Sequence, residues 1–157
     1  MDIKRLLQQK QILCKVAADT DRDSILDMMA EALAQGNVLS DKDAYLKAVK
    51  KREDDMSTQT NGGIALPHAC NGNVKKLGLC IATIADDGID FSDDADCKCR
   101  LLFMIAIPAD TPAAHIPLYA FLADFLTNSG KLDELLAADT PDEIIAMLTQ
   151  WQENTKQ

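Results

Sequence analysis

The chain of 157 residues carries a formal net charge of −9, and 47% of its residues are apolar and 26% charged. This length and composition predict one globular domain with a sizeable core, and they exclude disorder as the main state. The one basic cluster, residues 47–52, is followed at once by acidic residues, which argues against nucleic acid as a partner. An acidic surface instead favours a basic protein partner met by diffusion.

Sequence signals for membranes and export are missing. No apolar run approaches the ~20 residues of a membrane-spanning helix, and the N-terminus lacks the apolar region of a signal peptide. We therefore expect a cytoplasmic protein with no direct membrane insertion. The five cysteines are an odd number, and we expect reduced, mostly buried thiols.

Two helices are predicted in the first third of the chain. Apolar residues recur at helical spacing from Ile25 to Leu33, with Thr20 or Asp21 as N-cap and Gly36 at the end. A second helix is predicted over residues 41–54, with Ser40 as its N-cap.

Extended segments follow, and then helices return. A short apolar run ends at Pro67, residues 77–85 read as a buried strand, and residues 101–107 are typical of a central strand covered on both faces. Helices are predicted around 118–126, over 132–137, and after Thr140 as N-cap with Pro141 at the first position. This order predicts an α/β fold: a mixed β-sheet flanked by helices on both sides, in a single domain over residues 1–157.

His68 is the first candidate for chemistry. Pro67 fixes its own φ and biases Leu66 toward an extended shape, so we expect His68 to be presented rigidly at the end of a strand. Imidazole can act as a neutral nucleophile near pH 7. A loop histidine without function is the ordinary alternative.

Two further residues favour a phosphoryl site around His68. His115 is expected in the first turn of a helix, where unpaired backbone N–H groups favour an anion. Arg52 lies near the end of the second predicted helix, and its guanidinium suits phosphoryl oxygens. No Gly-rich loop with a lysine is present, so a phosphohistidine intermediate is a more natural hypothesis than ATP as donor.

Other sequence patterns are weaker evidence for a functional site. His115 can also be an ordinary, partly buried histidine, Arg52 a solvated helix end, and Tyr119 a core residue of its helix. Cys97 and Cys99 lack a second ligand pair for zinc, and the acidic residues 86–96 lack the spacing of a calcium loop. We therefore expect no metal and no cofactor.

At this point the residues resemble a known family. Arg52-Glu53, Ser57-Thr58 and the run from Gly63 to His68 resemble the type-2 enzyme IIA domains of the bacterial sugar phosphotransferase system (PTS), the fructose/mannitol group. The strand ending at Pro108, followed by His115-Ile116 and a helix, resembles the second histidine region of that family, and residues 135–144 resemble its closing helix.

The resemblance implies a phosphotransferase component. His68 would accept a phosphoryl group from phospho-HPr and pass it to an enzyme IIB for carbohydrate uptake, with His115 and Arg52 as active-site companions. An alternative is a nitrogen-type regulatory enzyme IIA, in which the phosphorylation state of His68 controls protein partners. A third is an enzyme IIA-like domain without phosphotransfer.

One segment departs from the family. A Gly-x-Gly-type turn usually follows Ser-Thr, but here Gln59 and Asn61 replace the glycines. Asn tolerates left-handed backbone angles and Gln does so poorly. We therefore expect a differently shaped loop beside the site.

Overall fold

A five-stranded mixed sheet lies at the centre of the computed structural model, which describes residues 1–156. The strand order is β1-β4-β5-β2, with β3 also on β5. β4 and β5 are antiparallel, and the other pairs are parallel. The strands are β1 (Ile12–Val16), β2 (Ile64–Ala65), β3 (His68–Asn71), β4 (Gly78–Ile84) and β5 (Leu101–Pro108).

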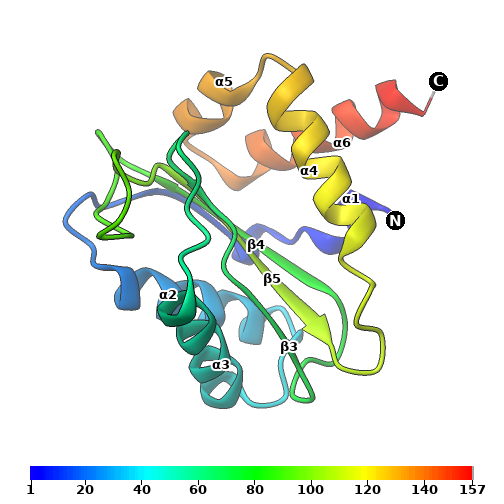
Figure 1. Cartoon of the computed structure of the whole chain (residues 1–157). Coiled ribbons are helices and arrows are strands. Elements are labelled where there is room, and N and C mark those ends of the chain that lie inside the picture. The colour runs from blue at the N-terminus through cyan, green and yellow to red at the C-terminus, as the bar shows by residue number, and fades with distance from the viewer. Residues whose placement is uncertain (157) are drawn as a thin grey trace.

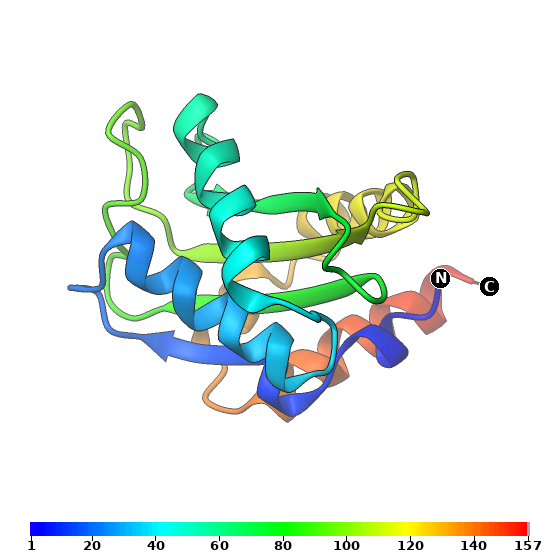
Figure 2. The same ribbon diagram turned by 90° about the horizontal axis from the view of Figure 1, so that it is seen from below.

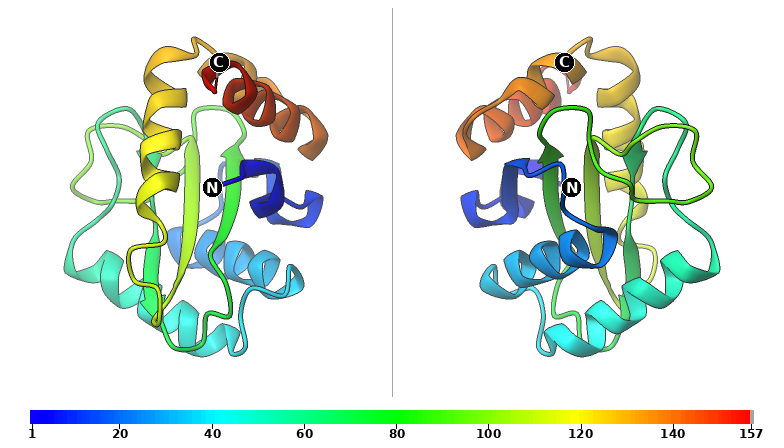
Figure 3. Two further views of the ribbon diagram at one scale, coloured as in Figure 1. Left: turned by 90° about the vertical axis from the view of Figure 1, so that its right-hand side faces the viewer. Right: turned by 90° about the vertical axis from the view of Figure 1, so that its left-hand side faces the viewer.

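Helices cover both faces of this sheet, as the sequence predicted (Figure 1, Figure 3). One layer contains α2 (Arg22–Gln35) and α3 (Lys42–Asp55). The other contains α1 (Ile3–Leu6), α4 (Ile116–Asn128), α5 (Leu132–Ala137) and α6 (Pro141–Thr155). Within residues 1–156, no helix has the length and apolar character needed to cross a membrane.

The alternation of side chains along the strands divides the core into two halves. Ala82, Leu102 and Met104 face α2 and α3, whereas Ile81, Leu101 and Phe103 face α4 and α6. β4 and β5 are buried along their whole length, which explains why they read as unbroken apolar runs.

Helix caps agree with the sequence except at α3. The side chain of Asp21 caps α2 and that of Thr140 caps α6, with Pro141 in the first turn. At α3 the predicted cap Ser40 was wrong: Asp41 accepts the hydrogen bond from the Ala44 amide, and the Ser40 hydroxyl donates to the Asn73 carbonyl.

The sequence analysis predicted no element before residue 20, so it missed α1 and β1. β1 is short and contains Lys15 at a φ of 53°, so it lacks the alternation of a regular strand. The N-terminal residues are tied to α6, since the Gln152 side chain accepts from the Ile3 amide at 3.0 Å and donates to the Met1 carbonyl at 3.3 Å. In Figure 2 the N-terminal helix α1 accordingly lies alongside α6.

Candidate active site

The short edge strand β3 presents His68. Its first residue is His68, which pairs in register with Ile105 of β5, while Ala69 pairs with Ala106. Ala69 packs into the core under α2 and α3, so the His68 side chain faces the opposite layer, toward α4. The prediction that His68 lies at the end of a strand was wrong in detail, because β2 stops at Ala65 and the residues 66–67 separate it from β3.

One hydrogen bond sets the chemistry of the His68 ring. Nδ1 lies 2.8 Å from the carbonyl oxygen of Leu66. A carbonyl only accepts hydrogen bonds, so Nδ1 carries the hydrogen and Nε2 keeps its lone pair. Pro67 between the two residues has no N–H of its own, and its carbonyl accepts from the Ile105 amide at 3.0 Å. The backbone therefore fixes the tautomer of His68.

Arg52 approaches from the other helical layer. It lies in the last turn of α3, which packs against β3, and its side chain is half-buried. Nη1 donates to the Met56 carbonyl at 2.7 Å, which anchors one side of the guanidinium. The remaining N–H groups of the guanidinium can serve an anion.

His115 occupies the N-cap position of α4, but its side chain makes no capping hydrogen bond. Its Nδ1 is buried and has no hydrogen-bond partner among the residues that the structure describes. The helix start offers fewer amides than expected, because the Ile116 amide bonds to Ala113 and Pro117 has none. The imidazole of His115, rather than the backbone, is thus the main polar group at this end of α4.

Tyr119 lies beside both histidines, and it is only partly buried against the core to which its helical spacing assigned it. Its ring meets the His115 ring at a centroid distance of 5.0 Å and the His68 ring at 6.0 Å, both edge to face. Burial raises the pKa of Tyr119, and the positive charge of Arg52 opposes that rise. His68 and His115 therefore meet at one aromatic ring, and Arg52 lies at the end of α3, which packs against β3.

A buried carboxylate holds the loop that leads to His68. Glu53 is only 4% exposed, and it accepts from the Thr58 amide at 2.9 Å and from the Thr58 hydroxyl. The same hydroxyl accepts from the Leu66 amide at 3.1 Å. Since Leu66 also binds the His68 ring, this chain of bonds connects the end of α3 to the imidazole. Sequence reasoning had singled out Glu53 and Thr58 only as parts of a family motif.

The Gln59–Asn61 segment does not require left-handed angles. Neither residue has a positive φ; the left-handed position in this turn is Gly63, at a φ of 74°. The Gln59 side-chain amide donates to the Cys97 carbonyl at 2.8 Å, and the Cys97 thiol donates to the Asn61 carbonyl. Gln59 and Asn61 therefore need no left-handed angle, and the loop is tied to Cys97.

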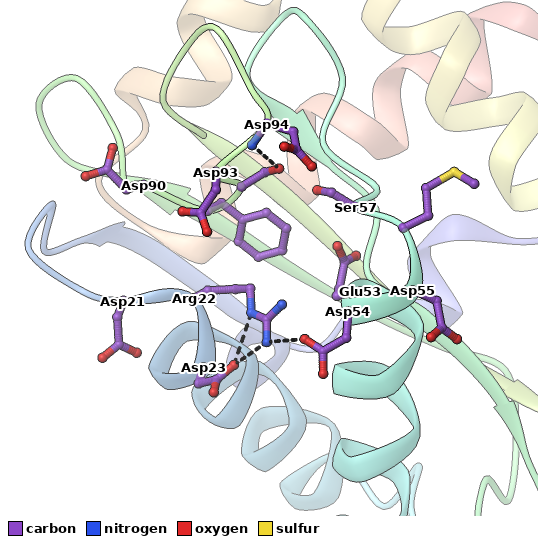
Figure 4. Close-up of a pocket in the computed structure, with 13 residues that line it drawn as sticks. Asp21, Arg22, Asp23, Glu53, Asp54, Asp55, Ser57, Asp90, Asp93 and Asp94 are labelled. Atoms are coloured by element: carbon purple, nitrogen blue, oxygen red, sulfur yellow. Dashed lines mark hydrogen bonds and ion pairs between the residues drawn. The ribbon is translucent and has the colours of Figure 1, made fainter.

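An acidic hollow of about 660 Å³ lies beside the end of α3 (Figure 4). Eight carboxylates and one arginine, Arg22, are among its lining residues. Arg22 bonds to Asp23 at 3.0 Å and to Asp54 at 2.8 Å, so its charge is already neutralised. Neither histidine lines this hollow, and its negative field repels a phosphoryl group. The surface next to the site is thus acidic, as the composition suggested.

The cysteines and the possible metal ligands of residues 1–156 form neither a disulfide nor a metal-binding cluster. All five thiols are free; Cys80 and Cys99 are buried, but Cys70 and Cys97 are exposed, contrary to the prediction of mostly buried thiols. Within residues 1–156, no three histidine, cysteine or acidic side chains are grouped so that they could hold a metal ion.

The architecture and the arrangement of its layers define the class of protein. The nitrogen regulatory protein IIA-Ntr of Neisseria meningitidis superposes with a TM-score of 0.79 at 19% identity, covering 94% of this chain and 99% of that one. The IIA-mannitol component in a complex with phosphorylated enzyme IIB from Escherichia coli gives 0.76 at 22% identity, covering 92% and 97%. The fold is therefore that of PTS IIA proteins.

Sequence comparison gives the family. Residues 5–151 match the family model described as phosphoenolpyruvate-dependent sugar phosphotransferase system, EIIA 2, so the chain belongs to this family, as its motifs indicated. A fructose-specific EIIABC component of Bacillus subtilis is 28% identical over 96% of this chain, which spans only 23% of that protein. A fructose-specific EIIA component of Haloferax volcanii is 28% identical over 82% of this chain and 83% of its own length.

Proposed function

We propose that this chain is a phosphocarrier that accepts a phosphoryl group on Nε2 of His68 from phospho-HPr and passes it to an enzyme IIB for carbohydrate uptake. The observation that carries the proposal is the bond between Nδ1 of His68 and the Leu66 carbonyl. It holds the neutral ring in the tautomer whose free lone pair is on Nε2.

The chemical step follows from that tautomer. Nε2 attacks the phosphorus of a phosphohistidyl donor, so the new N–P bond forms as the donor N–P bond breaks and its electron pair returns to the donor ring. The His68 ring then bears both the Nδ1 hydrogen and the phosphoryl group, and it carries a positive charge. The Leu66 carbonyl accepts from Nδ1 and stabilises that charge.

Arg52 and His115 stabilise the transferred group. The guanidinium of Arg52 donates to the equatorial oxygens, whose negative charge is largest in the transition state. His115 brings an imidazole into the same site from the N-cap position of α4, and Arg52 lies within α3. Such positioning and charge stabilisation supply most of the catalysis in phosphoryl transfer.

The surroundings support protein partners for this transfer. The acidic hollow beside α3 complements a basic protein surface. Relatives named as fructose- and mannitol-specific EIIA components point to sugar uptake. A solved IIA-mannitol chain of the same fold is bound to phosphorylated enzyme IIB, which supports an enzyme IIB as acceptor here.

Labelling tests the proposal. The chain is incubated with enzyme I, HPr and radiolabelled phosphoenolpyruvate, and the acid-labile label on the protein is counted. We expect label on the native chain, none on His68→Ala, and slower labelling of His115→Ala. Label that persists on His68→Ala contradicts the assignment of the nucleophile.

Addition of an enzyme IIB separates transport from regulation. Rapid loss of label to an enzyme IIB encoded with this chain supports sugar uptake. Label that stays on His68, with phosphorylation-dependent binding of another protein, supports the regulatory alternative.

A further inference from the structure

Tyr119 differs from the other apolar and aromatic residues on its helix face. Leu118, Leu122 and Phe125 are buried in the core, whereas Tyr119 is half-exposed. Its amide donates to the His115 carbonyl at 2.9 Å, which is the first helical bond of α4. Tyr119 therefore stands one turn after His115 on the same side of the helix, directly above the edge strand that carries His68.

The ring of Tyr119 touches both imidazoles. The angle between ring planes is 90° with His115 and 84° with His68, and the respective centroid distances are 5.0 Å and 6.0 Å. These edge-to-face contacts are the favourable geometry for aromatic pairs. One side chain thus bridges two histidines that come from different elements, β3 and α4.

The hydroxyl of Tyr119 is available. It makes no hydrogen bond with any residue in the described part of the chain, and it is not among the buried atoms that lack a partner. Burial raises the pKa of this phenol, so it stays protonated at neutral pH and can donate.

We propose that Tyr119 is a further active-site residue, whose ring holds the imidazoles of His68 and His115 in place and whose hydroxyl donates a hydrogen bond to a phosphoryl oxygen on His68. This inference rests on the proposed role of His68 as phosphoryl acceptor. The hydroxyl adds a neutral donor beside the charged Arg52, and a hydrogen bond to a charged acceptor corresponds to roughly a tenfold effect on a rate or more.

Three variants separate the ring from the hydroxyl. Tyr119→Phe keeps the ring and removes only the donor, and Tyr119→Leu removes both. Phe121→Leu is the matched control, because Phe121 is another half-buried aromatic residue of α4 and forms no ring contact with either histidine among the described residues.

Each variant is phosphorylated in two ways, by phospho-HPr and by the small donor phosphoramidate. The rate of acceptance, the hydrolysis half-life of the phosphohistidine and its ³¹P chemical shift are measured. We expect Tyr119→Phe to accept about tenfold more slowly from either donor and to shift the ³¹P resonance, with an unchanged melting temperature. We expect a larger loss for Tyr119→Leu and native behaviour for Phe121→Leu.

The outcomes are distinguishable. Native rates and an unchanged ³¹P shift in Tyr119→Phe overturn the role of the hydroxyl, and native rates in Tyr119→Leu overturn the whole inference. If phospho-HPr fails with the native chain while phosphoramidate reveals the Tyr119 effect, the proposed donor is refuted and the inference stands. If His68 is not phosphorylated by either donor, both are refuted.

A spectroscopic titration checks the geometry independently of transfer. The second tyrosine, Tyr45, is fully buried with a pKa well above the ordinary value, so the first phenol to ionise is Tyr119. Loss of the positive charge in Arg52→Gln must move this ionisation to higher pH, and Tyr119→Phe must abolish it. An ionisation that does not move in Arg52→Gln overturns the charge interaction between the guanidinium and the phenol.

Discussion

The hydroxyl of Thr58 offers a measurable test of how the site is held. It donates to the buried carboxylate of Glu53 and accepts from the Leu66 amide at 3.1 Å. Thr58→Val keeps the shape of the side chain and removes both bonds. Thr58→Ser is the matched control, because it keeps the hydroxyl and loses only a methyl group.

The two lost hydrogen bonds determine how much stability Thr58→Val loses. A hydrogen bond to a charged group contributes about 1.5–3 kcal/mol, and an amide left without a partner costs about 1–3 kcal/mol. Leu66 and Thr58 are half-buried, so water satisfies part of what is lost. We expect Thr58→Val to lower the free energy of unfolding by about 3 kcal/mol, and Thr58→Ser by less than about 1 kcal/mol.

Two measurements test this prediction: urea unfolding, which gives the stability, and the rate of phosphoryl transfer to His68. The midpoint falls in Thr58→Val with an unchanged slope, and the melting temperature drops by about 6–12 °C for a domain of this size. Because Leu66 orients the His68 ring, the rate of acceptance on His68 should fall as well. A Thr58→Val protein with the same stability as Thr58→Ser would refute the connection from Glu53 to the imidazole.

Two further predictions concern the loops and the thiols. We expect Gly63→Ala to lower the free energy of unfolding by about 1–3 kcal/mol, because a Cβ would lie 2.6 Å from the Lys98 carbonyl and the φ is +74°. Thermal melts measure this loss. Gly62→Ala, where nothing lies within 4 Å of the added Cβ, is the control and should melt like the native chain. Burial raises the pKa of Cys99 to about 12, so at pH 8 its thiol stays protonated and inert while the exposed Cys97 reacts. Peptide mapping by mass spectrometry after alkylation should therefore find Cys97 modified before unfolding and Cys99 only after it. Equal labelling of both in the native protein would contradict the burial of Cys99.

The sequence predicted most of the fold because most elements carry strong local signals. α2 and α6 have periodic apolar faces and clear caps, and β5 is an unbroken apolar run. β1 was missed because Lys15 interrupts it at a left-handed φ and no alternation marks its ends. Its place in the sheet depends on pairing with β4, which is a contact distant in sequence.

In the candidate site, too, some residues could be proposed from the sequence and others only from the structure. His68, His115 and Arg52 could be proposed from the sequence, since their residue types suit phosphoryl chemistry. Glu53 could not be recognised as buried, because it stands within a run of charged residues at the end of α3. Tyr119 shares a helical face with Leu118 and Leu122, so periodicity assigns it to the core. Only the sheet edge below α4 leaves it half-exposed beside the histidines.

The break at residues 66–67 also bears on aggregation. A free sheet edge invites another chain to add a strand, which is a route to aggregation. Here the edge consists of the two-residue β2 and the four-residue β3, separated by Leu66 and Pro67. Pro67 has no N–H to offer, and the Leu66 amide and carbonyl are already bonded to Thr58 and His68. The backbone that orients the imidazole thus also keeps this edge from acting as a template for a foreign strand.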